Sequence, residues 1–168
     1  MIDTSKLGER LLQNYRFRTA RKHLRGDVMD FGGNQGELRP YVTGDYIVVN
    51  YDHSVMGDKR FDTIAALAVI EHIRTGDVYD IFGKLTRSHM QPSGKIVLTT
   101  PTPMSKPLLS LLSRFGIIGR ENIEEHKHYW TRADIERLAA SIGLRVEEYR
   151  KFQLGFNQIA VLSKAETM

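Results

Sequence analysis

The sequence predicts a single α/β domain of 168 residues, built on a mostly parallel sheet. Its apolar runs are continuous rather than alternating, which is typical of strands that are covered on both faces. Helical patterns lie between these runs, so that β and α segments alternate along the chain. A cluster of glycines follows the first apolar run directly, in the order strand, turn, helix. With 41% hydrophobic and 26% charged residues and no low-complexity run, the whole chain is expected to fold as one domain.

The amino-terminal half of the chain is expected to contain one long helix and three strands. Thr4 or Ser5 can cap the helix, which should run to about Leu24 and occupy most of residues 1–25. Its apolar residues predict the buried stripe, which we expect to comprise Leu7, Leu11 and Tyr15, with Leu12 as a further candidate. The elements that follow are expected to be a strand at Val28–Phe31, a brief helix at Glu37–Val42, a strand at Tyr46–Tyr51 and a strand at Phe61–Val69.

The carboxy-terminal half predicts a helix, a strand, an insertion, a second helix and a hairpin. In chain order we expect a helix at Gly76–Met90, a turn at Pro92–Gly94, a strand at Lys95–Thr99, a helix from Thr131 to Gly143, and antiparallel strands at Arg145–Phe152 and Asn157–Ser163. Thr131 and Asp134 resemble a capping box, and Gly143 suits a left-handed helix end. Residues 104–130 form the insertion, whose apolar stretch Leu108–Ile118 suits core packing and a substrate lid equally well.

Composition excludes several classes of function. The chain has no cysteine, so disulfides, thiolate nucleophiles and cysteine-based metal sites are excluded. It has neither a secretory signal pattern nor an apolar run long enough to cross a bilayer, which predicts a cytoplasmic protein. The net charge of +4 is modest, and the basic residues near Arg16 are expected to lie on a solvated helix face rather than to bind nucleic acid. His126 and His128 lack a convincing third ligand, so no metal is expected.

Candidate ligand-binding residues follow the first two strands, at the sheet edge where open α/β sheets bind their ligands. Asp30 and the turn Gly32–Gly36 follow the first strand, and the absence of side chains there lets a ligand approach backbone N–H groups. Asp52 ends the second strand, where a carboxylate can accept hydrogen bonds from two ribose hydroxyls. The glycines match neither G-x-G-x-x-G nor a phosphate-binding loop, which argues against a pyrophosphate ligand.

Four segments resemble motifs of class I S-adenosylmethionine-dependent methyltransferases, especially the small-molecule subgroup called type 11. Val28–Leu38 is similar to the family's first motif, hydrophobic-hydrophobic-D-x-G-x-G-x-G, with two of three glycines matched. Phe61–Ile73 resembles the fourth strand and its FD...LEH signature. Pro92–Leu98 is similar to the PGG strand, and His128–Leu144 to the late helix. The resemblance implies a Rossmann-like, three-layer sandwich with an antiparallel carboxy-terminal hairpin.

The resemblance also implies a cofactor, S-adenosyl-L-methionine, and a set of residues that bind it. Its methionine part would lie against Asp30 and the backbone of Gly32, Gly33, Asn34 and Gly36. Asp52 would bind the ribose, His53 would lie beside the adenine, and the carbonyls of Ala66 and Leu67 would accept from the amino group. The expected function is methyl transfer to an oxygen or nitrogen of a small-molecule acceptor, such as a sugar or a lipid-linked metabolite. No general base is identified, since His72 suits a structural role at a helix start better than proton transfer.

Two departures from the family pattern carry further expectations. Asn34 replaces the middle glycine, which is tolerable because Asn enters positive φ more readily than most residues. Only eight residues separate Asp52 from Phe61, fewer than the about 10 to 12 that a helical crossover needs. We therefore expect the family's third strand to be missing and Tyr46–Tyr51 to form the sheet edge, covered by the first helix or, alternatively, by a second subunit of a homodimer. The same deletion motivates the alternative function, a non-catalytic binding or scaffold protein with a degenerate methyltransferase fold.

Overall fold

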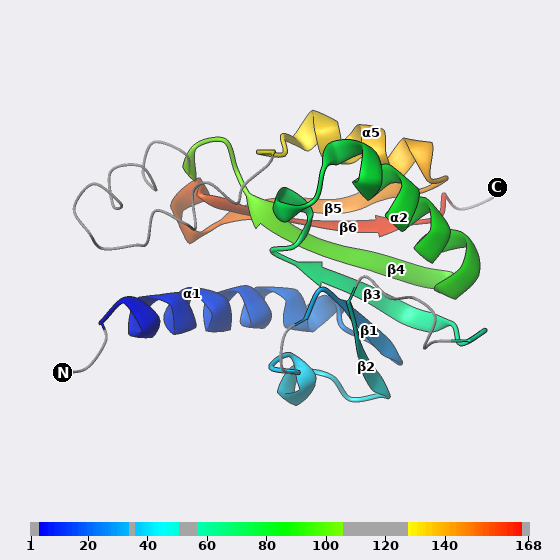
Figure 1. The fold of residues 1–168 in the computed structure, drawn as a ribbon, viewed down its shortest axis with the longest axis horizontal. Helices are drawn as coiled ribbons and strands as arrows, with labels where there is room; N and C mark the ends of the chain where they lie inside the picture. Colours follow the sequence, from blue (N-terminus) through cyan, green and yellow to red (C-terminus); the bar gives the residue numbers. More distant parts are fainter. Residues whose placement is uncertain (1–3, 34–35, 51–56, 106–127, 166–168) are drawn as a thin grey trace.

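A computed structural model describes residues 4–33, 36–50, 57–105 and 128–165, with side chains of the first helix described from residue 10 onward. The α-helices are α1 (Thr4–Ala20), α2 (Thr75–His89) and α5 (Arg132–Ser141), and the short 3-10 turns are η1 (Arg21–His23), η2 (Arg39–Tyr41), η4 (Ile70–His72) and η5 (Gln153–Gly155). The strands are β1 (Val28–Phe31), β2 (Tyr46–Val49), β3 (Phe61–Leu67), β4 (Met90–Pro101), β5 (Arg145–Phe152) and β6 (Asn157–Ser163) (Figure 1).

The strands form one six-stranded sheet in the order β2-β1-β3-β4-β6-β5. The first four of these are parallel to one another, whereas β6 pairs antiparallel with both β4 and β5. Within the described residues no strand lies outside β2, which confirms the predicted strand order. Residues 51–56, which include most of the expected irregular link, lie outside the described part of the chain.

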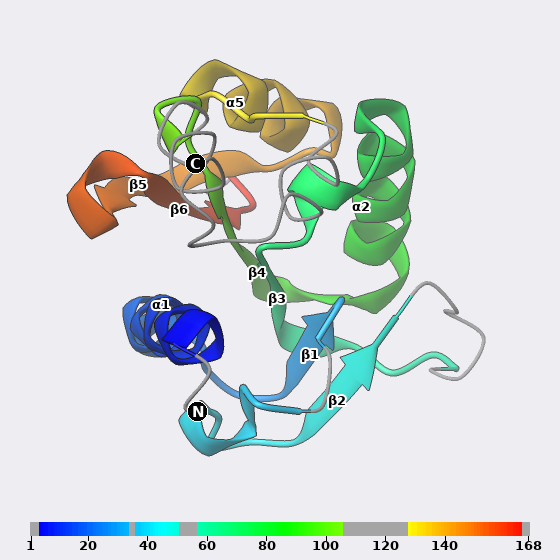
Figure 2. The same cartoon turned by 60° about the vertical axis from the view of Figure 1, so that its left-hand side comes forward.

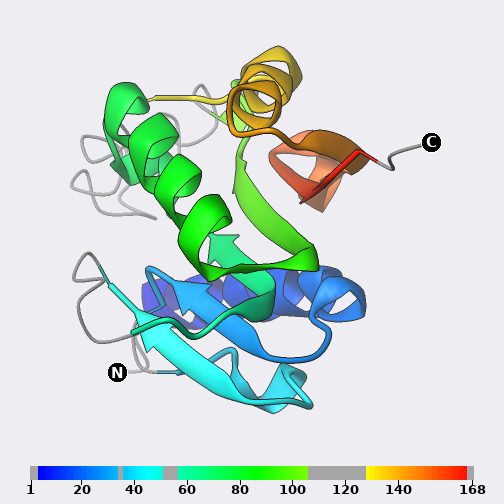
Figure 3. The same ribbon diagram turned by 90° about the vertical axis from the view of Figure 1, so that its right-hand side faces the viewer.

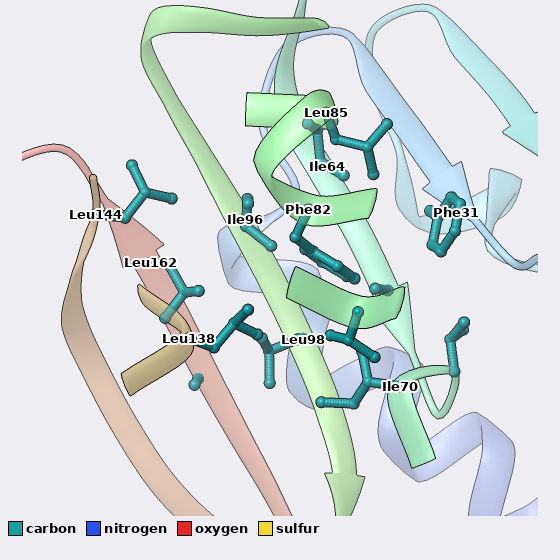
Figure 4. Close-up of a cluster of buried hydrophobic side chains, with 14 of the residues drawn as sticks. Phe31, Ile64, Ile70, Phe82, Leu85, Ile96, Leu98, Leu138, Leu144 and Leu162 are labelled. Atoms are coloured by element: carbon teal, nitrogen blue, oxygen red, sulfur yellow. The ribbon is translucent and has the colours of Figure 1, made fainter. Parts of the chain in front are cut away.

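Helices cover both faces of the sheet, which gives the predicted three layers (Figures 1 and 3). Ile96 and Leu98 of β4 pack in one cluster with Phe82 of α2 and Leu138 of α5 (Figure 4). Val97 lies between them in the strand and packs on the opposite face, against α1. Successive strand residues point to opposite faces, so a strand buried on both faces needs a continuous apolar run.

The predicted buried stripe of α1 is wrong. Leu11, Leu12 and Tyr15 are exposed by 62%, 53% and 51%, while the buried residues among the described side chains of the helix are Phe17 and Ala20. The side chain of Leu7 lies outside the described part of the helix. The helix is rotated relative to the prediction because Phe17 and Ala20 fit against the sheet. This rotation turns the half-buried side chain of Arg16 inward.

Three element boundaries differ from the prediction. The helix expected at Glu37–Val42 is only the 3-10 turn η2, which contains Pro40, a residue with no N–H for a helical hydrogen bond. β4 begins at Met90, so the Pro92–Gly94 turn is instead an irregular stretch of that strand, where its register with β3 shifts. β3 ends at Leu67 rather than at Val69, because Ala68 has a φ of 60° and the turn η4 follows.

The end of the chain follows the prediction closely. Thr131 and Asp134 form both hydrogen bonds of a capping box at the start of α5. Gly143 has a φ of 75°, in the left-handed region that favours glycine, and ends the helix. β5 and β6 pair antiparallel through η5, and Figure 2 shows how this hairpin extends the sheet beyond β4.

Candidate active site

The carboxyl ends of the four parallel strands meet at one edge of the sheet, and the turn after β1 lies at its centre. The N–H of Gly32 donates a hydrogen bond of 2.8 Å to the carbonyl of Val49, which ties this turn to the end of β2. Gly32 has a φ of 77°, and a Cβ there would lie 2.7 Å from both γ-carbons of Val69, beyond the end of β3. Only glycine fits this position, where the chain after β3 packs against the turn.

The Asp30 side chain is buried beneath the same turn. It is 5% exposed, and the Tyr46 hydroxyl donates to Oδ2 over 2.5 Å. Burial raises the pKa of Asp30, against the opposing effect of the Tyr46 hydrogen bond. Burial and the Asp30 carboxyl also raise the pKa of Tyr46, which therefore remains a donor at neutral pH. A Cβ on Gly33 would overlap the Asp30 carboxyl group, so the backbone passes directly over the acid.

The other predicted cofactor residues divide into those placed at this edge and those outside the described residues. Gly36 lies in the turn after β1, where its carbonyl accepts from the N–H of Arg39 at 2.9 Å. Ala66 and Leu67 form the end of β3, two strands from β2. Thus Asp30, Gly32, Gly33, Gly36, Ala66 and Leu67 are gathered at the carboxyl ends of β1 and β3. Asn34, Asp52 and His53 lie outside the described residues.

Sequence reasoning missed the approach of two opposite charges, Glu71 and Arg16, at the same edge. Glu71, in the turn η4 after β3, is 1% exposed, and it interacts electrostatically with Arg16 of α1. Glu71 Oε2 and Arg16 Nε are both buried without a hydrogen-bond partner. The signal for Glu71 was an acid inside the apolar run Val69–Ile73. Arg16 gave no such signal, because it lies among other basic residues of an amphipathic helix.

The surroundings of Glu71 favour its neutral form. Burial raises the pKa of Glu71 to about 7, and the neighbouring Arg16 guanidinium and Thr100 hydroxyl only partly oppose this effect. Burial lowers the pKa of Arg16, while Glu71 raises it. Tyr129 also lies near the carboxyl group, and its pKa is raised by burial and by Glu71. A carboxyl group that titrates near neutral pH can accept or release a proton under ordinary conditions.

The histidines have other surroundings. His72 follows Glu71 in η4 and is half-buried. His128 packs edge-on against Trp130, and its Nε2 lies 3.6 Å from a carboxylate oxygen of Asp134. His126 lies outside the described residues. The absence of a metal site thus stays a prediction.

The carboxyl end of β1 is followed by a tight glycine turn, at the edge where open α/β sheets bind their ligands. A Cβ on Gly32 would collide with Val69 and a Cβ on Gly33 with Asp30, so the glycines let the chain pack closely at this edge. Residues 4–149 match the sequence model of a family described as a methyltransferase domain. The chain belongs to the S-adenosylmethionine-dependent methyltransferase family. This membership confirms the fold and the family that the motifs of the sequence predict.

Several solved structures share the fold of this methyltransferase domain at low sequence identity. Magnesium protoporphyrin IX methyltransferase from Synechocystis, with bound SAH, has a TM-score of 0.62 at 16% identity, over 96% of this chain and 86% of that one. The pyocyanin biosynthetic protein PhzM has a TM-score of 0.67 at 18% identity, over 94% of this chain and 58% of that one. The small RNA methyltransferase HEN1 has a TM-score of 0.65 at 20% identity, over 92% of this chain and 25% of that one.

These similarities establish the fold and leave the acceptor open. The chain spans less than three fifths of PhzM and a quarter of HEN1, so those proteins contain much that has no counterpart here. No curated protein sequence matches the chain. Among the described residues, no helix is both long and apolar enough to cross a lipid bilayer.

Proposed function

We propose that the protein transfers a methyl group from S-adenosylmethionine to an oxygen or nitrogen of a small-molecule acceptor. The observation that carries the proposal is the convergence of Asp30 and the glycine turn with the end of β3, in a chain that belongs to the methyltransferase family. Similar structures named for pyocyanin biosynthesis and for mitomycin 7-O-methylation support a small-molecule acceptor. A sugar or lipid-linked acceptor and a cytoplasmic location are further parts of the proposal.

The chain's own residues would bind and orient the reactants. The backbone of the glycine turn would hold the methionine part of the cofactor, with Asp30 fixed beneath it by Tyr46. The carbonyls at the end of β3 would accept hydrogen bonds from the cofactor's amino group. S-adenosylmethionine supplies an activated methyl group on a sulfonium, which an acceptor atom attacks in line. Alignment of the reactants and exclusion of water can supply much of the rate in such a displacement.

The experiment that tests the proposal measures the binding of S-adenosylhomocysteine to Asp52→Ala. We expect this substitution to weaken binding by roughly 1.5 to 3 kcal/mol, because charge-assisted hydrogen bonds to the ribose are lost. Asp45→Ala is the matched control, since Asp45 is an exposed residue before β2 that pairs with Lys59. Equal affinity of the wild-type protein and a folded Asp52→Ala variant would remove Asp52 from the site.

A further inference from the structure

Large apolar side chains are exposed on neighbouring parts of α1 and η5, and we call them the apolar patch. Its members are Leu11, Leu12, Tyr15 and Leu154. The three on α1 adjoin one another, because residues three and four apart are neighbours on a helix surface. The hairpin lies beside them, since the Gln153 side-chain amide donates to the Leu12 carbonyl at 3.1 Å and Tyr15 stacks on Phe152.

Leu154 is the most prominent member of the patch. Its side chain is 92% exposed, and its φ of 58° lies in the left-handed region, which is costly for a leucine. Its neighbours Gln153 and Gly155 also have positive φ, so the whole turn is held in this unusual conformation. Strained backbone of this kind is found at binding sites. A strained turn that presents a leucine to solvent favours a partner outside this chain.

The segment that carries most of the patch is strongly basic. Residues 10–25 contain no aspartate or glutamate. The cations of this segment with exposed side chains are Arg10, Arg18, Arg21, Lys22 and Arg25. Lys22 pairs with Glu148 at 2.7 Å, whereas none of these four arginines has an ion pair with another described residue. Exposed leucines and uncompensated positive charge therefore occur together on this part of the molecule.

The patch lies on the same side of the molecule as the cofactor turn. Figure 1 shows η5 and the first half of α1 on the side toward which β3 and β4 point. The N–H of Thr102, just after β4, donates to the carbonyl of Phe156, just after η5, which fixes the hairpin turn at this end of the sheet. A partner that covers the patch would thus face the edge where the cofactor residues are gathered.

We propose that this face docks on a lipid bilayer that contains anionic lipids, with the apolar patch inserted among the headgroups and the arginines of α1 at the lipid phosphates. The inference goes beyond the proposed function and does not depend on it. Helices that combine leucines and aromatic residues with arginines and lysines bind anionic membrane surfaces in this way, because apolar burial and charge attraction add together.

The same observations disfavour two other partners. A nucleic acid would bind the arginines through its phosphates and leave the leucines in contact with water. A second copy of the chain would bring like charges together, because a twofold contact uses the same surface on both chains and the arginines would face one another. An anionic bilayer matches both the charge and the apolar side chains of the patch.

Sedimentation of the full chain with lipid vesicles tests the proposal. We expect the wild-type protein to sediment with phosphatidylcholine vesicles in which about a third of the lipid is phosphatidylglycerol, and not with pure phosphatidylcholine. Added salt should release it. Leu154→Ser should lower the partition coefficient by about tenfold, because an inserted leucine is lost. Arg18→Glu should lower it by about tenfold or more, because a cation is replaced by an anion.

Two matched controls change exposed residues on the opposite face of the sheet. Met104 is 53% exposed and lines a cavity with Thr131 at the start of α5, and Arg87 is an exposed residue of α2. α2 and α5 cover the face of the sheet opposite α1. Met104→Ser and Arg87→Glu should therefore bind anionic vesicles as the wild-type protein does. Circular dichroism confirms that each variant is folded.

Tryptophan fluorescence reports insertion directly. The chain has one tryptophan, Trp130, which is fully buried, so Leu154→Trp adds a distinct probe to the patch. Its emission should shift to shorter wavelengths when anionic vesicles are added, and brominated lipids should quench it. Met104→Trp should show neither effect.

Several results would overturn the proposal. One is a wild-type protein that sediments with neither kind of vesicle, or equally with both. Another is binding that Arg18→Glu weakens and Leu154→Ser leaves unchanged, since charge attraction alone would then explain it. Light scattering without lipid supplies a third: a dimer that Leu154→Ser dissociates would assign the patch to a second copy of the chain. Binding of an RNA oligonucleotide by a protein that does not bind vesicles would assign the arginines to a nucleic acid.

Discussion

Glu71→Gln should change the pH dependence of stability in a way that few other substitutions in this protein would. The pKa of Glu71 is raised from 4.5 in the unfolded chain to about 7 in the folded protein. Between these two values the folded protein holds a proton that the unfolded chain has released. The free energy of unfolding therefore falls as the pH rises through this window and levels off above about 7.

The size of this contribution follows from the shift. Each pKa unit corresponds to about 1.4 kcal/mol, so the shift of Glu71 amounts to about 3 kcal/mol across the window. The group is 1% exposed, so solvent does not screen the effect appreciably. Glutamine has nearly the same shape as glutamate and does not ionise. The free energy of unfolding of Glu71→Gln should therefore lack this contribution. Arg16 is half-buried in both proteins, so its desolvation shifts the variant's stability at every pH and leaves the pH dependence contributed by Glu71 unchanged.

Urea unfolding, followed by circular dichroism at pH values from about 4 to about 8, measures the two curves. Subtracting them removes the contributions of other groups, among them Asp30, whose pKa is also raised. The wild-type stability minus that of Glu71→Gln should fall by about 3 kcal/mol over the range. Glu147→Gln is the control. The Lys95 ion pair lowers the pKa of Glu147, so the contribution of Glu147 to the free energy of unfolding is complete above pH 4.5. The difference between the wild-type and Glu147→Gln stabilities should therefore be constant above that pH. A constant difference for Glu71→Gln would refute the reasoning.

Two further substitutions test the cofactor turn. Gly33→Ala should abolish S-adenosylhomocysteine binding in calorimetry, because the new Cβ would overlap the Asp30 carboxyl group. Gly143→Ala is the control, since a Cβ there meets open space; it should lower the free energy of unfolding by about 1 kcal/mol and bind the ligand normally. Equal binding by the two variants would contradict the role of the turn. Tyr46→Phe leaves the buried Asp30 carboxyl without its hydroxyl donor and should lower stability by about 1 to 3 kcal/mol in urea unfolding. A loss below about 0.5 kcal/mol would show that the carboxyl finds another partner.

Features governed by local sequence were predictable. The strand order followed from continuous apolar runs and from a link too short for a helical crossover. The capping box at Thr131 and the left-handed Gly143 depend on residues within one turn of each other. Asp30 and the glycines were placed by their position directly after a strand, since parallel strands bring their carboxyl ends together.

Features governed by packing between distant segments were not predictable. The apolar residues of α1 suggested a stripe through Leu11 and Tyr15, yet the helix buries Phe17 and Ala20. Tyr15 instead stacks on Phe152 of the distant hairpin, with ring centres 5.9 Å apart, and stays half-exposed. The approach of Arg16 to Glu71 depends on this helix rotation, which no local pattern reports. The part of the candidate site that sequence reasoning missed is thus the part built by α1.

The most direct test of the account is isothermal titration calorimetry of the wild-type protein with S-adenosylhomocysteine and S-adenosylmethionine. The account predicts saturable binding of both ligands at one site per chain, despite the shortened link after β2. Binding of neither ligand to the folded protein would contradict the account and favour a scaffold protein that retains only the methyltransferase fold.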